Sequence, residues 1–543
     1  MSSVKEQYDE KAQQDVIRDD AVDKIEFEDQ HYEETGLHES DAALANAPWK
    51  YKMIALATAL MLPVGSHFSG AALGAMKASL KENLMISNTR YGVLSSSVSI
   101  INTVFPVLGG FFIDTFGTVW GTLVINFMIL LGSLLTAIAA HVGQFPLMVV
   151  GQVVFGIGSG LIVTMQESLL SKWFRTKYLA LAIGMQLSIS RLSTFLGTLV
   201  SNPISERMDD WVWAFWLALI LCGFSIIMNL IYAYVLHHLQ GAVVTKTEIL
   251  RIKAKKTVHV RSLLKFPPYF WHIILIEFIF AAVWTVHQSV ATELVQIHFG
   301  TTQKLAAYKA SVSQVVPIVV TPILGVFIDL VGQRVKICKT HITVLLSAAF
   351  FVISCGLLGW TYVEPIAGMI LYSFSLAFGP ITMITSIGMI LPSDYIGTGL
   401  GLFKSSNNIG SSILDIIVGI VQDNTEGEKY TGVMTVFVIL GCVGFMIICG
   451  LYFTQRIYLK NLLELGRSKR EERMTEINDK ELFLTKQGLD SLNNKTTTNF
   501  NYFAIGIYVF FGICAWVLFF VFAVTGKASA REMSYLGLLH GQD

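Results

Sequence analysis

The chain has 543 residues, of which 53% are hydrophobic and 14% are charged, and its 39 basic and 39 acidic residues cancel. Soluble domains carry about 25% charged residues, so this composition excludes an ordinary soluble protein and indicates a membrane protein. A chain without net positive charge also gives no reason to expect a nucleic-acid partner.

The amino-terminal segment differs from the rest of the chain. Residues 1–48 contain 14 acidic and 4 basic residues, and no apolar run lies near Met1. This composition is typical of a disordered, soluble tail and argues against a cleavable signal peptide. We therefore expect an acidic disordered cytoplasmic tail over residues 1–48.

Apolar runs long enough to cross a bilayer of about 30 Å recur after this tail. Since lipid cannot satisfy backbone polar groups, each run is expected to be helical, which predicts an all-α membrane protein. We expect two six-helix bundles, at residues 49–236 and 269–455, joined by a basic cytoplasmic loop at 237–268. The predicted spans lie near residues 52–76, 90–113, 118–140, 144–168, 178–202 and 212–236 in the first bundle, and near 269–298, 306–330, 340–361, 363–391, 395–421 and 431–455 in the second. Pro63, Pro317, Pro322 and Pro380 lie inside predicted spans and are expected to kink or weaken them.

A thirteenth apolar run extends from Phe503 to Val524, after a charged segment at 456–500. It predicts an additional transmembrane helix at 501–525, followed by a tail at 526–543. Because this run has few polar residues, we expect a peripheral anchor and not a pore helix.

The distribution of basic residues predicts the orientation, because short cytoplasmic loops carry more Lys and Arg than external ones. Basic residues follow the fourth span, fill the 237–268 loop and follow the eighth span. We therefore expect a cytoplasmic amino terminus.

A short pattern occurs twice, at residues 110–117 and 325–332. In each copy a glycine is followed by an aspartate and a second glycine, with Asp114 and Gly117 in the first copy and Asp329 and Gly332 in the second. The element resembles the loop signature of the major facilitator superfamily, which implies two related six-helix bundles and a role in gating. Only the second copy is followed by basic residues, Arg334 among them.

The fourth and fifth spans carry a closer resemblance. Gly151–Gly158, Gln166, Lys172–Phe174 and the Gln186–Arg191 segment resemble the lysosomal dipeptide uniporter branch of the superfamily. Asn408 adds to this resemblance in the eleventh span. The resemblance implies a small-molecule substrate moved by alternating access, and a vacuolar or lysosome-like membrane, with the plasma membrane as the alternative.

Arg191 is expected near the middle of the bilayer, where an unpaired guanidinium is costly. The resemblance implies that Arg191 binds the carboxylate of a dipeptide, with Gln186 nearby, while an acid on the fourth span holds the amine. Gly160 stands where that acid is expected, so the amine anchor is missing. Glu167 lies two helical turns further on and is the candidate replacement, with an interfacial acid as the alternative.

Glu277 and Lys404 are ionisable residues inside the seventh and eleventh predicted spans. The two residues are expected either to pair with each other or to contact the substrate. For Glu277, uptake of a proton is a further alternative. Glu293 lies nearer the outer end of its span, where we expect it to be solvated.

Two other functions fit parts of the sequence. Cys442, Met446 and Cys449 share one helix face and could bind Cu(I), as in fungal copper carriers of this superfamily. A non-transporting receptor or scaffold of the same fold is the second alternative. An accessory subunit is a further candidate partner, besides the substrate and the lipid bilayer. The chain has no phosphate loop, zinc-protease motif or nucleophile elbow, so we expect neither an enzyme nor a bound cofactor.

Overall fold

The computed structural model describes residues 48–174, 178–240, 263–331, 340–391, 396–458 and 499–525, and these residues form helices and turns with no strand. The acidic tail up to residue 47, most of the 237–268 loop and the segment 459–498 lie outside the described residues. The protein is an all-α membrane protein, and seven of its described helical stretches are long and apolar enough to cross a membrane unaided.

The described helices cover most of each predicted apolar run, but several runs are divided or joined differently from the prediction. The first half comprises α2 (Trp49–Met61), α3 (Val64–Ala75), α4 (Lys77–Asn83), α5 (Asn88–Ile101), α6 (Phe105–Val142), α7 (Phe145–Phe174), α8 (Leu179–Arg207) and α9 (Trp213–Gln240). The second half comprises α12 (Pro268–Phe299), α13 (Gln303–Ser311), the 3-10 turn η1 (Val312–Gln314), α14 (Val315–Val331), α15 (Thr340–Trp360), α16 (Pro365–Ile390), α17 (Ile396–Asp423) and α18 (Thr431–Tyr458). The thirteenth apolar run forms α20 (Asn499–Thr525).

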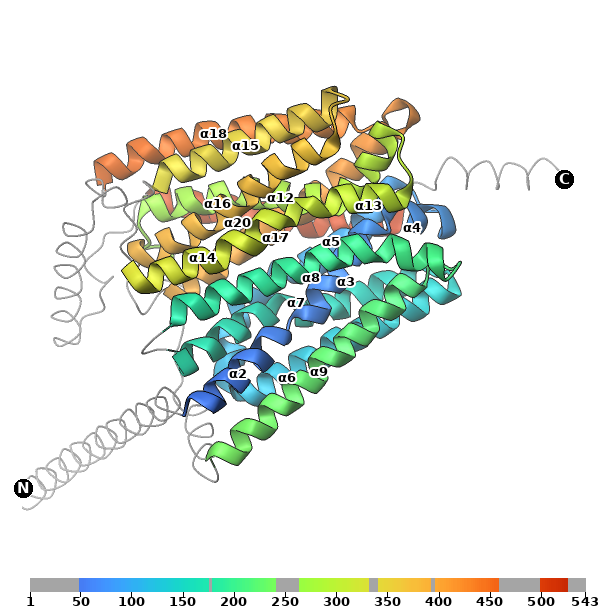
Figure 1. Cartoon of the computed structure of the whole chain (residues 1–543). Helices are drawn as coiled ribbons and strands as arrows, with labels where there is room; N and C mark the ends of the chain where they lie inside the picture. Colours follow the sequence, from blue (N-terminus) through green and yellow to red (C-terminus); the bar gives the residue numbers. More distant parts are fainter. Residues whose placement is uncertain are drawn as a thin grey trace, which may run out of the picture.

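Figure 1 shows the two halves as separate layers of roughly parallel helices. The blue-to-green first half lies below the yellow-to-orange second half, and α4 and α13 lie together at one end, here called the α4 end. Each half has its own core of buried apolar side chains, which for the second half is centred on α12. Such separate cores allow the halves to move as units.

Prolines explain where the spans break. A proline lacks an N–H and its ring clashes with the carbonyl four residues earlier. Pro63 separates α2 from α3, and η1 ends three residues before Pro317, which lies in the first turn of α14; the sequence predicts a weakened helix at both prolines. A third break, at Asn102–Val104, was not predicted; it lies just before Pro106, in the first turn of α6.

A proline cannot donate to the carbonyl four residues before it. At Pro63 and at Pro322, a side chain of a neighbouring helix donates to that carbonyl instead. The Gln166 side-chain amide donates to the Ala59 carbonyl at 2.8 Å, four residues before Pro63. The Ser188 hydroxyl donates to the Ile318 carbonyl at 2.6 Å, four residues before Pro322. The second bond joins α8 of the first half to α14 of the second. A carbonyl that lacks its helical donor because of Pro322 thus forms a contact between the halves.

The predicted boundary between the second and third spans is not seen as a break in the helix. Residues 105–142 form one 38-residue helix, α6, which at 1.5 Å per residue would measure about 57 Å. One bilayer crossing needs about 20 residues. α6 therefore contains the end of the second predicted span, the Asp114–Gly117 segment and the whole of the third predicted span.

α20 packs on the outside of the helix bundle, over the line where the two halves meet. Ala515 and Phe519 of α20 form one apolar cluster with Val93 and Ile100 of α5 and with residues of α17. Only 11% of its most apolar window is buried within the protein, so most of its surface is available to lipid. α20 is peripheral, and it contacts both halves.

Candidate functional site

Arg191 lies on α8 and is partly buried. Among the residues that the structure describes, no group forms an ion pair or a hydrogen bond with its guanidinium. Arg191 lies near His67 on α3 of the first half and near Tyr372 on α16 of the second. Arg191 is therefore a cation on the line between the halves, without a carboxylate partner in the described part of the chain.

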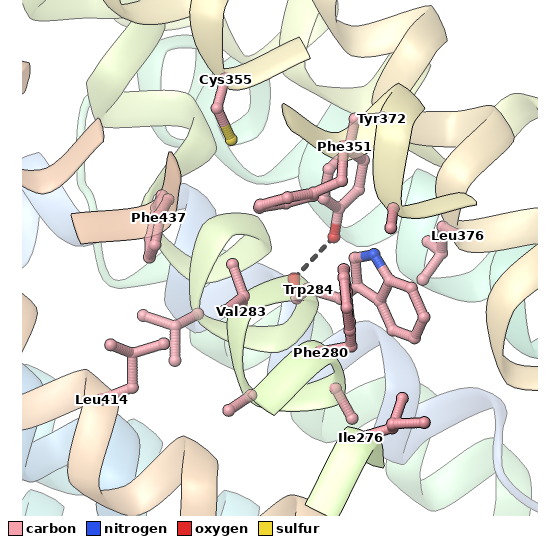
Figure 2. Packing of buried hydrophobic residues seen from close by; sticks show 14 of the residues in the cluster. Ile276, Phe280, Val283, Trp284, Phe351, Cys355, Tyr372, Leu376, Leu414 and Phe437 are labelled. Atoms are coloured by element: carbon pink, nitrogen blue, oxygen red, sulfur yellow. Dashed lines mark hydrogen bonds between the residues drawn. The ribbon is translucent and has the colours of Figure 1, made fainter. Parts of the chain in front are cut away.

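Tyr372, the second-half residue near Arg191, is held in a fixed position. Its hydroxyl donates to the Trp284 carbonyl at 2.6 Å, and Figure 2 shows this bond within a packed aromatic group that includes Phe351 and Phe280. The His287 ring stacks on Tyr372 with centroids 4.5 Å apart. The second half thus has a packed aromatic group near Arg191. The Tyr372 hydroxyl already donates a hydrogen bond within this group.

Gln186, also predicted at the site, is 1% exposed, and neither atom of its amide has a hydrogen-bond partner among the described residues. A buried amide without partners costs about 1–3 kcal/mol for each unmet group. Gln186 lies one and a half turns before Arg191 on α8. α8 therefore carries a buried amide without a hydrogen-bond partner and a guanidinium without an ion-pair partner among the described residues.

Lys404 and Glu167 connect the two halves. The Lys404 ammonium lies 3.5 Å from the Glu167 carboxylate and 3.1 Å from the Thr164 hydroxyl, both on α7. Asn408 donates its amide to the Lys404 carbonyl at 2.7 Å, within the same helix. Since Lys404 and Glu167 are both partly exposed, the pair is weakly held and can separate.

The expected pairing of Glu277 with Lys404 is wrong, because Lys404 projects from α17 toward α7 and not toward α12. Glu277 is 4% exposed, and its Oε2 atom has no partner among the described residues. An isolated ionised carboxylate in such a place is costly. Glu277 is therefore a buried acid with a carboxylate oxygen that no described residue satisfies.

The predicted gating residues fall where side chains are not described. Asp114 and Gly117 lie within the helical backbone of α6, and Asp329 lies in α14. Gly332 and Arg334 lie outside the described residues. Their gating role stays a prediction.

A cluster of charged and polar side chains closes the α4 end and was not predicted. The ammonium of Lys77 lies 2.7 Å from the carboxylate of Glu293 and donates to Gln422 at 2.7 Å; both charged residues are almost fully buried. Lys81 joins Glu293 to Glu428, and the Tyr430 hydroxyl donates to Glu293. The expectation of a solvated Glu293 is wrong, because α4 of the first half covers it.

Asp423 adds a second contact between the halves at the α4 end. Its carboxylate accepts the backbone N–H groups of Asn88 and Thr89 at 2.9 and 2.8 Å, at the first turn of α5. An anion is stabilised at a helix N-terminus. The sequence signals that could have revealed this closure are Lys77 and Lys81, one turn apart directly after the first span, and Asp423 at the end of the eleventh.

The sulfur residues of the copper alternative lie on α18. Cys442 is exposed, Cys449 is partly exposed and Met446 is 63% exposed, so this face points away from the helix bundle. In the part of the chain that the structure describes, no group of three or more His, Cys, Asp or Glu side chains is arranged to hold a metal ion.

A family model described as Major Facilitator Superfamily matches residues 59–414. The chain belongs to the major facilitator superfamily. Members of this superfamily are transporters that bind small-molecule substrates within a membrane, and the chain is a multi-pass membrane protein of this kind.

Curated relatives support a narrower comparison. The lysosomal dipeptide transporter MFSD1 of Mus musculus is 24% identical over 464 residues, which cover 81% of this chain and 96% of the relative. The Bos taurus protein of the same name is 26% identical over 432 residues, which cover 78% and 89%.

Solved structures agree on the fold. The POT family transporter PepTSo superposes with a TM-score of 0.56 at 14% identity, covering 76% of this chain and 99% of that one. The xylose transporter XylE from E. coli, in an inward open conformation, superposes with a TM-score of 0.55 at 14% identity, covering 74% and 95%. At this identity the likeness concerns the fold alone.

Proposed function

We propose that this transporter carries a small organic carboxylate, with a dipeptide as the first candidate, by alternating access between its two halves. The observation that carries the proposal is Arg191, a guanidinium between the halves with no counter-ion among the described residues. A guanidinium matches a carboxylate with two parallel hydrogen bonds. A substrate carboxylate would therefore supply the missing counter-charge at the point where both halves can contact it.

The relatives support the dipeptide as the first candidate, because their names describe lysosomal dipeptide transporters. On the same ground we propose a vacuolar or lysosome-like membrane, and from the basic residues of the loops we propose a cytoplasmic amino terminus. The α4 end would then face the lumen, and its buried Lys77–Glu293 pair would keep that side closed. Asp114 and Asp329 are proposed to set the balance between the two open states.

In the proposed cycle, substrate enters from the side opposite the α4 end. Binding neutralises Arg191 and draws the halves together around the substrate. The weak Lys404–Glu167 pair contributes to closure on the entry side, and the cluster at the α4 end then separates. The chain needs no nucleotide for these steps, because substrate or ion gradients drive the transport.

The test is uptake of labelled alanyl-alanine into proteoliposomes that contain the purified full chain. Arg191→Ala should lower kcat/KM at least about tenfold, because a charge-assisted hydrogen bond is worth about 1.5–3 kcal/mol. Arg191→Lys should retain part of the activity, since lysine keeps the charge but loses the fork. Arg207→Ala, at the exposed end of the same helix, is the matched control and should transport normally.

Three outcomes would contradict the proposal in different ways. No flux for any dipeptide, amino acid or organic acid would favour a receptor. Copper uptake that depends on Cys442 and Cys449 would favour a metal carrier. Normal dipeptide uptake by Arg191→Ala would leave the transporter intact and remove Arg191 from its site.

A further inference from the structure

The space beside Gly160 on α7 is filled by the side chain of Asn102. A Cβ atom added at Gly160 would lie 1.8 Å from the Asn102 Oδ1 atom and 2.5 Å from its Cγ atom. Neither distance is compatible with a real side chain. Asn102 therefore occupies the place in which any larger residue at position 160, an acid included, would lie.

The Asn102 amide has no hydrogen-bond partner on its oxygen. Asn102 is 5% exposed, and Oδ1 is buried without a donor among the described residues. Leaving such an oxygen unpaired costs about 1–3 kcal/mol. A buried acceptor of this kind, in a carrier that must bind a polar solute, is suited to a donor that the solute brings.

The backbone around Asn102 explains why the side chain can reach this place. Asn102 follows the last residue of α5, in the break caused by Pro106. The next residue, Thr103, accepts the Ser405 hydroxyl of α17 on its backbone carbonyl. Asn102 is thus one residue away from a contact between the two halves.

The same face of α7 continues toward Lys404. Thr164 lies one turn and Glu167 two turns beyond Gly160, and both contact the Lys404 ammonium of the second half. Gly160 itself is partly exposed. The Asn102 amide therefore lies at one end of a row of polar groups that extends along α7 to the contact between the halves.

We infer that Asn102 is a second substrate anchor, whose Oδ1 atom accepts a hydrogen bond from the amine or amide N–H group of the substrate. The inference rests on the proposed function, in which Arg191 holds the carboxylate. An uncharged carbonyl oxygen accepts from an amide N–H as well as from an ammonium group. This carrier should therefore tolerate substrates whose amino group is acylated.

The experiment compares alanyl-alanine with N-acetyl-alanyl-alanine as probes for uptake by the full chain in proteoliposomes. Wild type should have kcat/KM values for the two within about threefold. Asn102→Asp, which adds a negative charge in the same volume, should favour the free ammonium by at least about tenfold over the acetylated form. Asn102→Leu should reduce uptake of both about tenfold, mainly through KM.

A second pair of variants tests the geometry and controls for folding. Gly160→Ala should lower the melting temperature and the uptake, because its methyl group collides with Asn102. The double variant Asn102→Ala with Gly160→Ala should recover the melting temperature, while the uptake remains low because the acceptor is gone. Recovery of both would mean that Asn102 only packs.

Failure of this inference is distinct from failure of the proposed function. If wild type transports dipeptides through Arg191 but Asn102→Asp keeps the wild-type ratio between the two probes, the Asn102 anchor is wrong and the proposed function stands. A wild type that already rejects the acetylated probe more than tenfold also contradicts the anchor. If wild type transports neither probe, both the proposed function and this anchor fail.

Discussion

Single polar residues of the described chain differ in whether they have partners, and the residues proposed to bind substrate differ in this from those at the α4 end. Gln186 and Asn102 of the first half carry buried amide atoms without a hydrogen-bond partner among the described residues, and Arg191 has no ion-pair partner there, whereas Lys77 and Glu293 at the α4 end have several partners each. Unpaired buried polar groups lower the stability of the folded state, and a ligand that binds them raises it again. Burial lowers the pKa of Lys77 while Glu293 opposes the shift, so the pair depends on close contact.

The Lys404–Glu167 pair gives a prediction at this scale. Since the pair is partly exposed and 3.5 Å apart, it should contribute less than about 1 kcal/mol to stability. Glu167→Gln and Lys404→Gln should therefore shift the melting temperature by only a few degrees, yet slow the uptake. The charge-swapped double variant E167K/K404E should recover uptake relative to either single reversal. A large loss of stability in the neutral variants would contradict the view that this contact opens in each cycle.

At the scale of helices, α20 is the element that departs from a two-bundle carrier. Asn501 donates its amide to the Leu264 and Phe266 carbonyls before α12, at 2.6 and 2.9 Å. Trp516 donates to the Thr103 hydroxyl of the first half at 3.1 Å. An open groove of about 550 Å³ beside α20, Thr103 and Ile409 is lined mostly by apolar atoms. α20 is thus fastened to the second half and contacts the first by fewer polar bonds.

This arrangement predicts that the docking of α20 depends on Asn501. Asn501→Ala removes the amide that donates to the Leu264 and Phe266 carbonyls and should lower the free energy of unfolding by about 1–3 kcal/mol. Asn424→Ala is the control, because Asn424 donates only to the Ile420 carbonyl of its own helix and is exposed. Thermal unfolding in detergent measures both. Equal melting temperatures for the two variants would show that the Asn501 bonds do not hold α20 in place.

The sequence predicts most helices because an apolar run of about 20 residues has few other stable conformations in lipid. It also locates the Pro63 and Pro317 breaks, since proline acts locally. The break at Asn102–Val104 was missed although Pro106 signals it. The partners of Lys404, Glu293 and Gly160 depend on how the helices rotate against each other, and a single sequence does not contain that information.

At the scale of the whole molecule, the two halves are joined by contacts of unequal strength. The cluster at the α4 end includes a buried ion pair, whose rupture by loss of one partner costs about 3–5 kcal/mol. The contact at Lys404 and Glu167 is partly exposed and weaker. The structure is therefore closed at the α4 end, and opening there requires separation of Lys77 from Glu293.

Lys77→Met should shift the population toward opening at the α4 end, because it leaves Glu293 without its closest partner. Ser289, whose carbonyl accepts the Tyr91 hydroxyl across the two halves, reports this change. A Ser289→Cys variant should react faster with a membrane-impermeant maleimide when Lys77→Met is present. Lys304→Met, which breaks the exposed pair with Glu206, is the control and should leave the rate unchanged. Equal labelling rates in both backgrounds would contradict a gate at the α4 end.

Counterflow is the measurement that tests the central claim most directly. Proteoliposomes loaded with unlabelled alanyl-alanine should accumulate labelled alanyl-alanine transiently above equilibrium, because a carrier with alternating access returns faster when loaded. Arg191→Ala should abolish this overshoot, while Arg207→Ala should keep it. An overshoot in Arg191→Ala equal to that of wild type, or none in wild type, would contradict the account.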